Sequence, residues 1–154
     1  MHKFIAGFLL SVSLACLSPI ASASSPVQAD MAGAVAKPFE LSCGVGNGLF
    51  QGYVKGHYYN YGSSKGIYIT QYKIYQDDEL ATYGDKANIN LAAFSSNGPV
   101  KEVASPDNRR QDNQWHSVTQ NIPSIAGSKV LVRVTFVFDR PRKKDPSCSS
   151  ELLI

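Results

Sequence analysis

The stretch Lys129–Asp139, KVLVRVTFVFD, decides the fold class of this chain. Every second residue from Val130 to Phe138 is large and apolar, whereas the alternate row mixes polar and apolar side chains. This two-residue period is that of a β-strand with one face in a core and the other face partly in water. A slip of register by one residue would expose a whole row of large apolar groups, so the pairing of this strand should be well specified.

Similar alternation recurs along the chain and predicts further strands. They are expected over residues 48–54, 57–61, 66–76, 87–94, 100–104 and 114–122. The dipeptide Asn97-Gly98 is a strong turn signal and predicts a hairpin between two of them. Lys55-Gly56 separates the first two, and Pro123 should end the last. No segment after residue 38 shows a sustained helical period. We therefore predict an all-β fold, an antiparallel β-sandwich or jelly-roll-like barrel of short strands.

Two details of this prediction concern the sides and ends of strands. Within 66–76, strict alternation places Ile67 and Ile69 on one face, and Tyr68, Thr70, Tyr72 and Ile74 on the other. The segment 140–150 contains two prolines and few apolar residues, so we expect an exposed tail there, held by Cys148.

Residues 1–23 have the composition of an export signal. A short basic start is followed by an apolar run over 4–17, and Ala-Ser-Ala at 21–23 matches the small-x-small cleavage pattern. The run is too short for a bilayer, which takes about 20 residues to span. We expect cleavage there, a flexible lead-in over 24–37, and one β-sandwich domain over 38–154 in a secreted or periplasmic protein.

Cys43 and Cys148 are the cysteines that remain once the signal, which contains Cys16, is removed. In an exported chain two cysteines are expected to pair. The bridge would close a loop of about 100 residues, for which the chain-entropy model gives about 4.7 kcal/mol as an upper figure. We therefore expect a disulfide that ties the two ends of the domain together.

The net charge of the chain is small. It is +3 for the whole sequence, and +2 without Lys3. This is too little for a surface that tracks phosphates, so we expect no nucleic-acid partner. No segment after residue 23 is long and apolar enough for a transmembrane helix, and we predict none. The basic groups at 109–110 and 140–144 are interpreted as solubilising charges.

Aromatic residues provide the main functional signal. All 8 tyrosines lie between Tyr53 and Tyr83, most densely in the run HYYNYG at 57–62. A tyrosine offers a flat apolar face and an orienting hydroxyl, which suits stacking on a sugar ring or a peptide. Alternation along 114–122 slightly favours an outward Trp115. The predicted ligand-binding residues are Tyr58, Tyr59, Tyr61, Trp115, His57 and Asn60. The alternative is that the tyrosines fill half-buried sheet faces.

Motifs for catalysis and cofactor binding are scarce. His57 and His116 are the histidines outside the signal, and the motifs Ser-x-x-Lys, Gly-x-Ser-x-Gly and His-Glu-x-x-His are absent. The acidic run 77–79 and the oxygen-rich segment 107–113 could each contribute ligands to Ca²⁺, but neither has the spacing of a calcium loop. We predict no catalytic residue and no metal or cofactor, with Ca²⁺ as the alternative.

These observations favour an exported, non-catalytic binding domain whose ligand is a carbohydrate or another cell-envelope component. A secreted protein-interaction module, such as an inhibitor or effector, is the first alternative. A small hydrolase that uses His57 or His116 is the second. Because sandwiches host many unrelated functions, the ligand class must be argued from the site and not from the fold.

Overall fold

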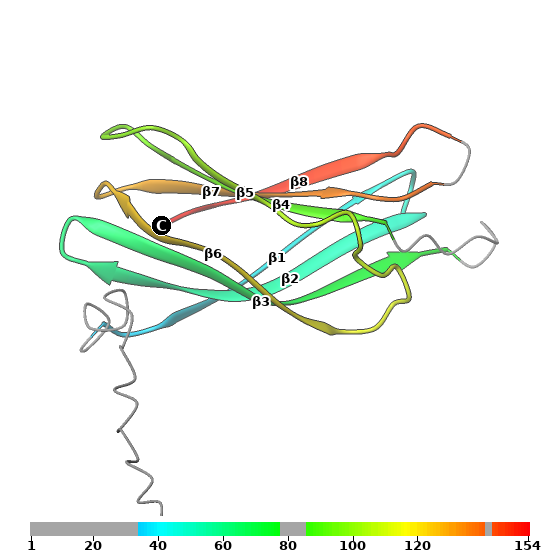
Figure 1. The fold of residues 1–154 in the computed structure, drawn as a ribbon, viewed down its shortest axis with the longest axis horizontal. Helices are drawn as coiled ribbons and strands as arrows, with labels where there is room; N and C mark the ends of the chain where they lie inside the picture. The colour runs from blue at the N-terminus through cyan, green and yellow to red at the C-terminus, as the bar shows by residue number, and fades with distance from the viewer. Residues whose placement is uncertain (1–33, 78–85, 141–142) are drawn as a thin grey trace, which may run out of the picture.

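Two four-stranded antiparallel sheets lie face to face in the computed structural model (Figure 1), which describes residues 34–77, 86–140 and 143–154. The first sheet has the order β1-β2-β3-β6 and the second sheet the order β5-β4-β7-β8. The strands are β1 Lys37–Val45, β2 Phe50–Tyr61, β3 Ser64–Gln76, β4 Asn88–Ser95, β5 Lys101–Ala104, β6 His116–Ala126, β7 Val130–Val137 and β8 Ser147–Leu153. The predicted all-β antiparallel sandwich is confirmed.

The core lies between the sheets and follows the predicted alternation most closely in the second sheet. Every second side chain from Val130 to Phe138 is fully buried, as are Ala87 just before β4 and the row from Ile89 to Ala93 on β4. The expected hairpin is present, since β4 pairs with β5. The sheets approach closely at Gly52 of β2, where a Cβ atom would lie 2.3 Å from the ring of Phe136 on β7. A side chain at this position would therefore displace the core.

Bulges in the first sheet correct two of the predictions. The expected strands 48–54 and 57–61 are one strand, β2, which carries a register shift between Lys55 and Gly56. In β3 a second shift lies between Ile69 and Gln71, so Tyr72 and Ile74 share the buried face with Ile67 and Ile69. The predicted split of these side chains was wrong, because a bulge inserts one residue and reverses the alternation beyond it.

Edge strands account for the other differences. Pro123 does not end β6, which continues to Ala126. β6 pairs with β3 alone, and on an edge strand a proline costs no ladder hydrogen bond. The expected exposed tail is also wrong in its last part, because β8 pairs with β7 along the other edge of the second sheet. β1 is the outer strand of the first sheet and was not among the predicted strands.

The two sheets are fastened at both edges. A disulfide joins Cys43 of β1 to Cys148 of β8 with 5.9 Å between their Cα atoms, which confirms the predicted pairing. At the opposite edge the buried Gln120 of β6 donates its amide to the carbonyls of Ile89 on β4 and Val103 beside it on β5. A covalent bond and a buried amide thus hold the layers in register.

Candidate functional site

The outward side of the first sheet carries most of the aromatic residues of β2 and β3. On β2 the residues that alternate with the inward Gly52, Val54 and Gly56 point outward, and Tyr68 does so on β3. The register pairs His57 with Tyr68 and Tyr53 with Lys73. We call this surface the aromatic face. It consists of Tyr53, Lys55, His57, Tyr59, Tyr61, Tyr68, Lys73 and Trp115.

Four rings at one end of the aromatic face form a continuous cluster. The His57 ring stacks on Tyr68 with 5.5 Å between centroids and meets Tyr59 edge-on at 5.1 Å. Tyr59 also meets Tyr68 edge-on at 5.5 Å and lies parallel to Tyr61 at 6.0 Å. The Tyr61 ring covers Gly66 of β3, where a Cβ atom would come within 2.9 Å of it. These contacts fix the rings before any ligand arrives, which lowers the entropic cost of binding.

Trp115 and two lysines form the other end. Trp115 comes just before β6 and is 40% exposed. The ammonium group of Lys55 lies 4.6 Å, and that of Lys73 5.5 Å, from the centroid of the indole ring. Lys73 also lies 4.7 Å from the ring of Tyr53. Cation–π attraction at these distances holds both ammonium groups at the surface of the indole.

An open groove of about 320 Å³ continues from this end toward the β1–β2 turn. It is lined by Asn47, Gly48, Gln51, Tyr53, Lys73, Tyr75, Asp77 and Asn113. Asn47 and Asn113 have φ angles of 56° and 59°, and they are the described residues other than glycine with positive φ. Amide, hydroxyl and charged groups thus surround a hollow beside Trp115, and such groups can donate to and accept from a polar ligand.

The six residues predicted from the sequence do not share one surface. His57, Tyr59, Tyr61 and Trp115 belong to the aromatic face. Tyr58 points the other way and packs against the core, with the Lys37 ammonium 5.9 Å from its ring. Asn60 accepts a hydrogen bond of 2.8 Å from the buried Lys65. Tyr53, Tyr68, Lys55 and Lys73 were missed, although the two-residue period of β2 could have pointed to Tyr53 and Lys55.

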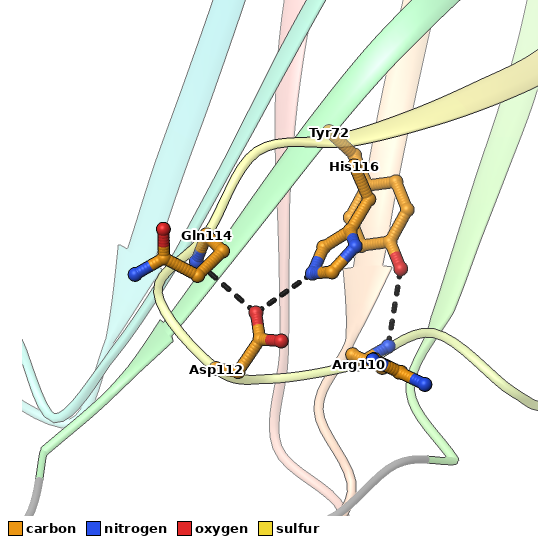
Figure 2. Close-up of polar contacts among 5 residues, drawn as sticks. All are labelled: Tyr72, Arg110, Asp112, Gln114 and His116. Carbon is orange, nitrogen blue, oxygen red and sulfur yellow. Dashed lines mark hydrogen bonds and ion pairs between the residues drawn. The ribbon is translucent and has the colours of Figure 1, made fainter.

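A polar cluster anchors the segment that carries Trp115 (Figure 2). Asp112 lies between the backbone of Gln114, whose N–H donates to it at 3.1 Å, and the Nε2 atom of His116 at 2.7 Å. The His116 ring stacks on Tyr72 at 5.2 Å, and the Tyr72 hydroxyl accepts from the Arg110 N–H at 3.1 Å. Burial alone would raise the pKa of Asp112, but its bonds to His116 and Gln114 and the charge of His116 lower it overall.

This cluster bears on the hydrolase alternative because it supplies His116 with a carboxylate. A histidine paired with a carboxylate can act as a general base when a substrate proton lies within reach. In this chain the same contacts fix the residues on both sides of Trp115. The imidazole ring of His116 is also partly covered by Tyr72. These contacts therefore place Asp112 and His116 in the segment that carries Trp115.

The described residues offer neither a metal-binding cluster nor a membrane-spanning helix. Within these ranges no group of three or more His, Cys, Asp or Glu side chains could hold a metal ion. Asp78 and Glu79 of the predicted acidic run lie outside them, as do the expected signal and most of the expected lead-in. The same ranges contain no helix with the length and apolar character that a membrane crossing requires.

Comparison with known proteins adds no relative. No protein-family model matches the chain, and neither the curated proteins nor the solved structures include a match.

Proposed function

We propose that this protein is a non-catalytic binding domain whose aromatic face holds a carbohydrate or a similar component of a cell envelope. The observation that carries the proposal is a row of rings from Tyr61 to Tyr53 and Trp115 on the outside of a rigid sheet. Rings of this kind stack on the apolar faces of sugars, and the hydroxyls and amides around them accept and donate hydrogen bonds.

The dimensions of the surface suit an extended polymer. Tyr53 and Tyr61 are eight positions apart on β2, which corresponds to about 26 Å at about 3.3 Å per residue. The groove at Tyr53 then gives the row one polar end. A ligand that lies along β2 could contact the ring cluster, the indole and the groove together, so several weak contacts would add up.

The compartment forms part of the proposal. We propose export to the periplasm or the exterior, where such a ligand would be met. The Cys43–Cys148 disulfide supports an oxidising environment, because such bonds persist mainly outside the cytosol.

A glycan array followed by titration of the best-retained glycan tests the function. We expect Trp115→Ala and Tyr59→Ala each to weaken binding by about tenfold, equivalent to about 1.4 kcal/mol. Phe94→Ala is the matched control, because Phe94 is a half-buried ring on β4 of the second sheet. Its affinity should stay at the wild-type value.

Two results would overturn the proposal. One is an array without any retained glycan. The other is glycan binding that survives Trp115→Ala and Tyr59→Ala combined in a chain that still unfolds cooperatively. A protein captured through the same rings, with no glycan retained, would favour the interaction module instead.

A further inference from the structure

The two lysines of the aromatic face differ in whether a carboxylate lies near them. Lys55 has one carboxylate nearby, Glu40 at 3.4 Å, and the two side chains are 40% and 71% exposed. Exposed pairs of this kind are weak and screened by salt. Within the described part of the chain Lys73 forms no ion pair with a carboxylate, and its ammonium group lies over the rings of Tyr53 and Trp115 instead.

On the outward side of the second sheet, the cation Arg133 has a carboxylate partner. Arg133 on β7 forms an ion pair of 2.7 Å with Glu151, the residue opposite it on β8. These two side chains are also partly exposed, at 42% and 44%, but their charged groups lie closer together than those of Lys55 and Glu40. On the aromatic face the two ammonium groups are instead held over an indole ring, where they can still attract an anion.

We infer that the ligand of the aromatic face is an acidic glycan, a chain of sugars that bear carboxylates. This inference rests on the proposed function. One sugar ring packs against the exposed part of Trp115, and its carboxylate is bound by the ammonium groups of Lys55 and Lys73 that lie over the indole. The groove beside Lys73 takes the neighbouring sugar, whose hydroxyls meet the amides of Asn47, Gln51 and Asn113.

The acidic groups near this position limit where the carboxylate can lie. Asp77 also lines the groove, and Glu40 lies beside Lys55. Both would repel a carboxylate placed next to them, so the site favours an anion over the indole, between the two lysines.

Methyl esterification provides a matched pair of probes, because it removes the charge and keeps the sugar backbone. We would titrate the full chain with polygalacturonate and with alginate, each against its methyl ester, at low and high salt. At least one acid form should bind about tenfold more tightly than its ester, because the ester cannot form charge-assisted hydrogen bonds with the two ammonium groups. The preference should shrink as salt is raised.

Substitution of the lysines tests the location. The double variant Lys55→Gln/Lys73→Gln should bind acid and ester almost equally and keep Trp115-dependent binding. Lys129→Gln/Lys144→Gln is the control, because it removes the same charge from exposed positions outside the aromatic face. It should keep the acid preference.

The outcomes separate this inference from the proposed function. If array glycans bind through Trp115 but every acid form binds no better than its ester, the acidic ligand is wrong and the carbohydrate function stands. An acid preference that persists in the Lys55/Lys73 variant would also overturn the inference. A blank array would overturn both.

Discussion

The outward faces of the two sheets differ far more than their inward faces. Both inward faces are rows of buried aliphatic and aromatic side chains that form one core. Outside, the first sheet carries the linked rings and two lysines of the aromatic face. On the second sheet, Arg133 pairs with Glu151 and lies over Phe94, while the hydroxyls of Thr135 and Ser149 lie 2.7 Å apart.

This contrast separates the inward residues that the fold requires from the outward residues that it leaves free to vary. The sandwich needs apolar inward rows, and both sheets supply them. The outward polar groups of the second sheet pair with one another across neighbouring strands, which is typical of a face that meets water. The rings of the first sheet also pair, but they leave a half-exposed indole and an adjoining groove. The packing of the core does not account for them, so they call for a functional explanation.

Loss of the disulfide should have the largest effect, and it should act on both faces equally. The bond closes a separation of 105 residues and joins the sheets. We expect Cys43→Ala/Cys148→Ala to lower the free energy of unfolding by about 2–5 kcal/mol. Urea unfolding of the variant and of the oxidised and reduced wild type measures this. The folded fraction should keep the ligand preference of the wild type. If the variant folds but loses the ligand preference, then the aromatic face depends on the disulfide as well as on its own residues.

Removal of one outward ring should cost less. Tyr59→Ala deletes one ring from the aromatic face, and Phe94→Ala deletes one from the second sheet. Aromatic and cation–π contacts of this kind contribute about 0.5–1.5 kcal/mol, so we expect each variant to lose about 1 kcal/mol. Urea unfolding checks both. A loss above about 3 kcal/mol for Tyr59→Ala would be typical of truncation in a core. The rings of the aromatic face would then serve the stability of the fold.

Much of the fold was readable from local pattern. The second sheet followed it well, because β4 and β7 pair without a register shift and their inward rows are uninterrupted. The first sheet was harder, because its register shifts arise in the pairing of β2 with β3 and of β3 with β6, which the local residue pattern does not contain. β1 and β8 are edge strands that pair on one side, and their weaker apolar pattern is easily mistaken for a loop.

The candidate site was predictable in part, for the same reason. An outward Trp115 and the tyrosines of β2 follow from residue type and a two-residue period. Tyr58 and Asn60 were grouped with them because the run was treated as one loop, whereas it is a strand with two sides. The lysines over the indole could not be found, because their contact depends on how β2 and β3 pair and on where the segment before β6 returns.

The smallest expected effect on stability concerns Asp112 and its contact with His116, in the segment that carries Trp115. Asp112→Asn keeps the shape of the side chain and removes its charge. Asp112 is 38% exposed, so screening by water limits the loss at pH 7 to below about 1 kcal/mol. Because folding lowers the pKa of Asp112, its contribution is complete above the ordinary aspartate value and is lost as pH falls through the folded pKa.

Urea unfolding at pH 7, 5 and 3 measures this dependence. The difference between wild type and Asp112→Asn should be smaller at pH 3 than at pH 5. If the aspartate positions the indole as well as stabilising the chain, glycan affinity at pH 7 should fall by more than in Phe94→Ala, which leaves the aromatic face intact. A difference in stability that grew toward low pH would contradict the lowered pKa. Unchanged affinity would show that Trp115 keeps its place without the charge.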